Sequence, residues 1–209
     1  MESQRNVTGI VLAAGEGLRM GVTKQLLPFR GTTILECVVN SALASSLQQV
    51  IVVLGHQAEE IAPTLKNRNL SLVVNPGYRL GQSTSLKAGL RTLAADAEAV
   101  LFLLGDQPLV TPAIINLILG AYRDSGSPIV MPVFAGRRGN PVLFSKETFS
   151  RMESLSDDCG ARSLFGEYAA RLLTVSVADP AIHFDIDTQE DYQRLLQLEH
   201  SDAAGTNAF

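Results

Sequence analysis

The segment from Leu12 to Lys24 brings small residues and positive charge into one short stretch of chain. It contains two alanines and three glycines, and Arg19 and Lys24 are its cations. Small residues let the backbone approach a ligand closely. Backbone N–H groups together with cations are suited to binding phosphate groups. The segment therefore predicts a loop that holds the phosphates of a nucleotide. The alternative is an ordinary turn with surface charges.

Two better-known phosphate-binding loops do not fit this segment. A P-loop has the order Gly-x-x-x-x-Gly-Lys-Ser/Thr, whereas here the lysine is displaced and is followed by Gln25. A dinucleotide-binding loop needs Gly-x-Gly-x-x-Gly and an acidic residue at the end of the second strand. Here Gly21 comes one residue late, and the second expected strand is followed by Gly55 and His56.

Carboxylates occur at two further places where a metal ion could bind. Asp106 follows the apolar run Ala99–Leu104, and Asp185 and Asp187 are two residues apart. Mg²⁺ is usually held by one or two carboxylates with substrate phosphates and water. Asp185 and Asp187 would point to the same side of an extended segment. Alternatively, Asp106 begins a turn before Pro108, and Asp187 caps the helix that follows.

Other site classes find little support. The three histidines and two cysteines are scattered, so no zinc site is expected. The net charge is −4 and no Lys/Arg block occurs, which argues against a nucleic-acid partner. The N-terminus has no signal-peptide pattern, and no apolar run is long enough to span a bilayer. We therefore expect a cytoplasmic protein, with Cys37 and Cys159 reduced.

The rest of the chain alternates apolar runs with amphipathic segments, which predicts an α/β fold with a parallel sheet. Thr33 and Glu36 have capping-box spacing before a helix over Ile34–Leu43, and Thr111-Pro112 opens another over Ala113–Tyr122. A last helix should run from Gln189 to about Leu198. We expect one domain over residues 1–198 and a disordered tail over 199–209. The expected strands are Gly9–Leu12, Gln49–Leu54, Leu70–Val74, Ala99–Leu104, Pro128–Val133 and Arg171–Val177.

The order Leu12-Ala-Ala-Gly-x-Gly-x-Arg-Met-Gly21, followed by Lys24-Gln-Leu-Leu-Pro28, resembles the signature of the MobA-like nucleotidyltransferases. It is most similar to that of the molybdenum cofactor cytidylyltransferases, or MocA-type enzymes. The resemblance extends from about Val7 to Leu198. It implies a three-layer Rossmann-like sandwich with a mostly parallel sheet, the nucleotide-diphospho-sugar transferase-like fold.

The resemblance also implies roles in nucleotide binding and catalysis. Arg19 would bind the β- and γ-phosphates, and Lys24 would neutralise charge on the α-phosphate. Asp106 and Asp187 would hold Mg²⁺, or Mn²⁺ in its place, with Asp185 in support. The segment around Gly81 and Ser85 resembles the base-recognition element. The implied nucleotide-binding residues are Leu12, Ala13, Ala14, Gly15, Gly17, Arg19, Lys24, Gly81, Ser83, Ser85 and Asp106.

The segments 139–144 and 158–162 resemble parts of the family that line the acceptor half of the cleft. Arg137 and Arg138 are further candidates for an acceptor phosphate, although the simpler reading makes them surface residues. Asp157 stands where the family pattern has a glycine, so the loop there must bend differently if that glycine needs a positive φ. The implied acceptor-binding residues are Gln107, Asn140, Pro141, Asp158, Gly160 and Arg162.

The resemblance implies transfer of CMP from CTP to the phosphate of molybdenum-molybdopterin, with release of pyrophosphate. In this family Leu-Ala-Ala-Gly accompanies cytidine, and a glycine in place of Ala14 accompanies guanosine. One methyl group in a binding site changes the preference for one nucleotide over another by only about 1–3 kcal/mol. The product could pass to an apo-enzyme of the xanthine dehydrogenase type. Three alternatives stay open: guanylyl transfer from GTP, cytidylyl transfer to a sugar or polyol phosphate, and a non-catalytic cofactor carrier or insertion chaperone.

Overall fold

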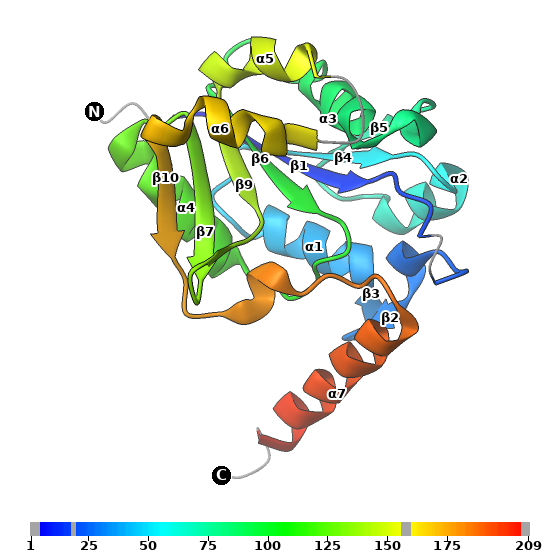
Figure 1. Cartoon of the computed structure of the whole chain (residues 1–209). Coiled ribbons are helices and arrows are strands. Elements are labelled where there is room, and N and C mark those ends of the chain that lie inside the picture. Colours follow the sequence, from blue (N-terminus) through cyan, green and yellow to red (C-terminus); the bar gives the residue numbers. More distant parts are fainter. Residues whose placement is uncertain (1–4, 18–19, 156–159, 206–209) are drawn as a thin grey trace.

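A mixed sheet of eight strands forms the centre of the molecule (Figure 1). The computed structural model describes residues 5–17, 20–155 and 160–205. Along the sheet the strands follow the order β10-β7-β9-β6-β1-β4-β5, and β8 pairs with β7. The strands are β1 (Val7–Ala13), β4 (Gln49–Leu54), β5 (Ser71–Val74), β6 (Ala99–Leu104), β7 (Ile129–Phe134), β8 (Arg137–Arg138), β9 (Val142–Ser145) and β10 (Leu172–Ser176).

Parallel pairing dominates the sheet, as the sequence predicts. Strand β1 lies parallel to both β4 and β6, β4 is parallel to β5, and β7 is parallel to β10. Strand β9 runs antiparallel between β6 and β7, and its four residues are buried. We did not expect it, because three apolar residues and a serine show no periodicity that distinguishes a buried strand from a loop lining a cleft. A small hairpin, β2 (Pro28–Phe29) and β3 (Thr32–Thr33), follows the phosphate-loop segment.

Helices cover both faces of the sheet, which confirms the three-layer α/β fold (Figure 1). The α-helices are α1 (Ile34–Leu43), α2 (Ala58–Ile61), α3 (Gln82–Leu90), α4 (Pro112–Ser125), α5 (Phe149–Glu153), α6 (Leu164–Glu167) and α7 (Gln189–Gly205). Short 3₁₀ helices are η1 (Lys24–Leu26), η2 (Ala62–Leu65), η3 (Tyr78–Leu80), η4 (Lys146–Thr148), η5 (Gly160–Ser163), η6 (Ala169–Arg171) and η7 (Pro180–His183). Among the helices of the described residues, none combines the length and apolar character needed to cross a membrane.

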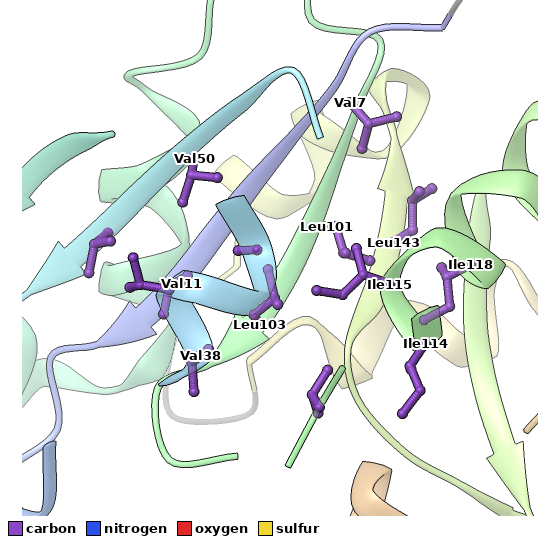
Figure 2. Close-up of a cluster of buried hydrophobic side chains, with 14 of the residues drawn as sticks. Val7, Val11, Val38, Val50, Leu101, Leu103, Ile114, Ile115, Ile118 and Leu143 are labelled. Atoms are coloured by element: carbon purple, nitrogen blue, oxygen red, sulfur yellow. The ribbon is translucent and has the colours of Figure 1, made fainter. Parts of the chain in front are cut away.

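Each face of the sheet has its own apolar core. Helices α1 and α4 pack on one face, where Figure 2 shows Leu101 and Leu143 of the sheet gathered with Ile115 of α4. Helices α3, α5 and α6 pack on the other face, with Leu86 and Met152 among the buried residues. Burial on two faces explains why the strand sequences are nearly continuous runs of apolar residues. The sheet is therefore a rigid support for the loops at its edge.

Local capping fixes where the main helices begin and end. Thr33 Oγ1 accepts a hydrogen bond from the backbone of Glu36, and Glu36 accepts one from Thr33 in return. The helix opened by Thr111 continues to Ser125, beyond the expected Tyr122, and ends at Gly126 with a φ of 64°. Gly is favoured there because that conformation is left-handed. Helix α7 continues to Gly205 rather than ending near Leu198, and Figure 1 shows it projecting from the body. The assignment of residues 1–198 to one domain stays a prediction.

Candidate active site

A cavity of about 1110 Å³ lies at the carboxyl ends of β1 and β6. In sheets of this kind ligands bind beyond those strand ends, and the volume is ample for a nucleoside triphosphate. Most of the residues expected to bind nucleotide or metal line it. These are Leu12, Ala13, Ala14, Gly15, Gly17, Lys24, Gly81, Ser85, Asp106 and Asp187, and Arg162 joins them.

The phosphate loop is shaped by Gln25, which is 3% exposed. Its Nε2 donates to the backbone carbonyls of Gly15, at 3.1 Å, and Ala13, at 3.4 Å. Gly17 has a φ of 61°, and a Cβ there would lie 3.3 Å from the carbonyl oxygen of Val22. A glycine is therefore favoured at this turn, because it adopts a positive φ without a steric penalty and has no side chain to press on Val22. Arg19, expected to bind the outer phosphates, lies outside the described residues.

Lys24 lies between the two carboxylates expected to hold a metal ion. Its Nζ is 2.6 Å from Asp106 Oδ2 and 3.0 Å from Asp187 Oδ1. Burial alone would lower the pKa of Lys24, but the neighbouring charges of Asp106 and Asp187 outweigh it and raise that pKa above its usual value. Lys24 is therefore positively charged at neutral pH.

Asp106 and Asp187 suit a divalent ion that is shared with a substrate. In the described part of the chain, no group of three or more His, Cys, Asp or Glu side chains could hold a metal ion. Two carboxylate oxygens do converge on one cation, the Lys24 ammonium. Two carboxylates completed by phosphate oxygens and water form a common Mg²⁺ environment. The residues therefore fit a metal held jointly by protein and triphosphate.

Gln107 and Asp185 form a hydrogen-bonded support beside this pair. Gln107 is only 1% exposed, and its side-chain Nε2 donates a hydrogen bond to Asp185 Oδ1 at 2.6 Å. Burial foremost, and then the charge of Asp106, raises the pKa of Asp185, while the Gln107 hydrogen bond acts in the opposite direction. Gln107, expected to contact the acceptor, lines neither the large cavity nor the smaller one that adjoins it, and its amide donates to Asp185 and to the backbone carbonyl of Ile182.

The segment expected to recognise the base is held by Asn75, which follows β5. Its Nδ2 donates to Thr84 Oγ1 at 2.9 Å and to Ser85 Oγ at 3.0 Å. Gly81, with a φ of 107°, and Ser85 both line the cavity. Ser83 is 3% exposed and does not line it, so the structure does not bring Ser83 to the nucleotide position.

Sequence reasoning missed a pair of charged residues at the cavity. Glu16 Oε1 accepts a hydrogen bond from Arg79 Nε at 2.7 Å, and both residues line the cavity. The Arg79 hydrogen bond lowers the pKa of Glu16 below its usual value. The Arg79 guanidinium also lies 5.6 Å from the centre of the Tyr78 ring. Nothing in the sequence signals this pair, because its members belong to separate motifs.

A second cavity of about 340 Å³ adjoins the first, and Leu12, Gln82, Leu104 and Arg162 line both. Three phenylalanines line it, and the rings of Phe144 and Phe165 stack with their centres 6.2 Å apart. Among the residues expected to bind the acceptor, Asn140 and Arg162 line this cavity.

The other acceptor candidates fall in different places. Pro141 and Gly160 do not line either cavity. Arg138 lines the second cavity, whereas Arg137 is exposed and lines neither. Asp158 lies outside the described residues, as does Asp157.

Comparisons with known proteins agree with this geometry. The family model described as a MobA-like NTP transferase domain matches residues 9–172. A molybdenum cofactor cytidylyltransferase of Escherichia coli K12 is 30% identical over 186 residues, which cover 88% of this chain and 92% of that protein. A nicotine blue oxidoreductase of Paenarthrobacter nicotinovorans is also 30% identical, over 91% of this chain and 96% of that protein.

A solved structure shares the fold at similar identity. The Rv0371c protein of Mycobacterium tuberculosis H37Rv superposes with a TM-score of 0.84 at 31% identity, covering 93% of this chain and all of that one. The same protein has also been solved in complex with manganese, and that structure superposes with a TM-score of 0.80 at 30% identity over 92% of this chain and 98% of that one. The chain belongs to the MobA-like NTP transferase family and is a nucleotidyltransferase of the MobA/MocA type.

Proposed function

We propose that this protein transfers CMP from CTP to the terminal phosphate of molybdenum-molybdopterin, forming molybdopterin cytosine dinucleotide and pyrophosphate. The observation that carries the proposal is the convergence of Lys24, Asp106 and Asp187 in a cavity of nucleotide size. The similarity to the Escherichia coli cytidylyltransferase supports the choice of nucleotide and acceptor.

The reaction needs positioning and charge stabilisation more than it needs a base. An acceptor phosphate oxygen attacks the α-phosphorus, and the bond from that phosphorus to the bridging oxygen breaks with its electron pair leaving on pyrophosphate. The attacking oxygen is already anionic, so no proton has to be removed. Groups fixed in advance around the reacting phosphate lower the barrier.

Each residue of the site has a task in this scheme. Backbone N–H groups of the Gly15–Gly17 turn hold the phosphates, and Arg19 binds the β- and γ-phosphates. Lys24 neutralises charge on the α-phosphate oxygens. Asp106 and Asp187 would hold Mg²⁺ or Mn²⁺, which supplies further positive charge at the phosphates.

The second cavity favours a flat acceptor over a sugar phosphate. Phe165 is half-buried and offers aromatic surface to this cavity, which suits contact with a heterocycle, while Phe102 and Phe144 are buried behind it at 5% and 1% exposure. A sugar or polyol would instead require many polar partners for its hydroxyl groups. Arg162 lines both cavities, which supports a role for its guanidinium in binding the acceptor phosphate.

The purified protein can be tested with each of the four ribonucleoside triphosphates, Mg²⁺, and either molybdopterin or a set of sugar phosphates. Pyrophosphate release with CTP and the pterin supports the proposal. Faster release with GTP supports guanylyl transfer, and release with a sugar phosphate supports that acceptor. If none of the four triphosphates gives pyrophosphate, the result supports a carrier or insertion chaperone.

A further inference from the structure

Lys24 and a metal ion compete for the same place. The ammonium lies 2.6 Å and 3.0 Å from one oxygen of each carboxylate. A Mg²⁺ ion binds carboxylate oxygens at about 2.1 Å and demands regular octahedral geometry. An ion shared by Asp106 and Asp187 would therefore sit against the ammonium, and two cations at such separation repel each other strongly.

Only side-chain rotation would be needed to move the Lys24 ammonium away from the carboxylates. Its main chain belongs to η1, where its carbonyl accepts a hydrogen bond from Leu27 N at 3.2 Å. Its stem runs beside the phosphate loop, since a Cβ placed on Gly17 would lie 3.7 Å from Lys24 Cγ and 3.9 Å from Cδ. Rotation of the flexible stem would carry the ammonium from the carboxylates toward phosphates bound in the loop.

We propose that the Lys24 ammonium occupies the Asp106–Asp187 pair while no nucleotide is bound, and that it thereby keeps the affinity of the pair for a metal ion low. A bound nucleoside triphosphate would pair with the ammonium instead and leave the two carboxylates open to the metal ion. The inference rests on the proposed function and adds coupling to it: nucleotide and metal each favour binding of the other. Reciprocity of this kind is required whenever two ligands shift the same equilibrium.

Electron paramagnetic resonance of free Mn²⁺, recorded at pH 8 without nucleotide, tests the proposal. The variant Lys24→Met removes the ammonium, and the matched control Lys66→Met removes the same charge from an exposed position away from the cavities. We expect K24M to bind Mn²⁺ about tenfold more tightly than the unmodified protein, within the usual range of coupling between sites. The control K66M should match the unmodified protein.

Two further variants keep the result interpretable. In K24M/D106N the gain in affinity should disappear, which assigns the ion to this carboxylate pair. If K24M folds poorly by circular dichroism, Lys24→Gln replaces it, since a neutral amide still donates to the carboxylates.

The inference would be overturned if the Lys24 variants bound Mn²⁺ no more tightly than the unmodified protein does. Because no turnover is measured, a failed transfer assay would count against the proposed function alone.

Discussion

The backbone N–H of Ile186 donates a 3.0 Å hydrogen bond to the backbone carbonyl of Asp106. This bond joins the turn after β6 to the segment that leads into α7, and it brings the neighbouring Asp187 to the same side of Lys24. Asp191 extends the attachment, because its carboxylate accepts hydrogen bonds from the backbones of Asp187 and Thr188. Main-chain contacts thus place the two carboxylates independently of any ligand.

The isosteric changes Asp106→Asn and Asp187→Asn should each lower turnover about 10²-fold or more, as expected when a charged group at a reacting phosphate is lost. Both proteins should still fold, because the backbone bond between the segments is unaffected. Asp124→Asn, an exposed change on α4, is the control and should leave turnover intact. Pyrophosphate release and circular dichroism measure the two effects, and more than a tenth of normal turnover in either variant would contradict the assignment.

The Gln107–Asp185 support predicts different outcomes for two changes at one position. Asp185→Asn keeps an oxygen that accepts from Gln107 Nε2, so turnover and stability should stay near normal. Asp185→Ala leaves Gln107 Nε2 with only its 3.4 Å hydrogen bond to the Ile182 carbonyl, so the unfolding free energy should fall by about 1 kcal/mol and turnover should fall as Asp187 is held less firmly. Urea unfolding and steady-state kinetics measure both effects. Equal behaviour of the two variants would show that the hydrogen bond has no positioning role.

Ala14 predicts how the base is selected. It is 5% exposed and lines the nucleotide cavity, so its methyl group takes space that a purine would need. Ala14→Gly should lower the ratio of kcat/KM for CTP over GTP by about 10- to 100-fold, the usual worth of one methyl group. Comparing two nucleotides on one variant cancels general loss of activity. An unchanged ratio would remove Ala14 from the account of specificity.

The Glu16–Arg79 pair predicts a compensating double variant. Arg79→Met leaves the Glu16 carboxylate unopposed beside the triphosphate, and the repulsion between these anions should raise the KM for CTP several-fold. Adding Glu16→Gln should restore a nearly normal KM. Arg79 is largely exposed, so its loss should change the unfolding free energy little. If R79M/E16Q is no better than R79M, Arg79 acts on the nucleotide directly.

Much of the fold could be predicted because both faces of the sheet are buried. The runs Gln49–Leu54 and Ala99–Leu104 are strands with the expected limits. Alternation of strands and helices then indicated that Asp106 lies at the ligand-binding edge. Strand β9 escaped prediction because its antiparallel insertion depends on long-range pairing rather than on local pattern.

The contacts within the site were harder to predict than its location. Small residues and charges in the first loop indicated phosphate binding, and that loop does line the large cavity. The direction of the Gln107 amide and the pairing of Glu16 with Arg79 depend on tertiary packing, which leaves no local trace in the sequence. The position of Lys24 between both carboxylates also depends on tertiary packing and could not be predicted from the local sequence.

The central claim is that the α-phosphate of CTP moves to the acceptor while the outer two phosphates leave together. Parallel reactions with [α-³²P]CTP and [γ-³²P]CTP, molybdenum-molybdopterin and Mg²⁺ follow both halves of the nucleotide. The account predicts that the α-label appears in a pterin dinucleotide and that the γ-label appears in pyrophosphate, in equal amounts. An α-label that remains in CTP, or a γ-label released as single phosphate, would contradict it.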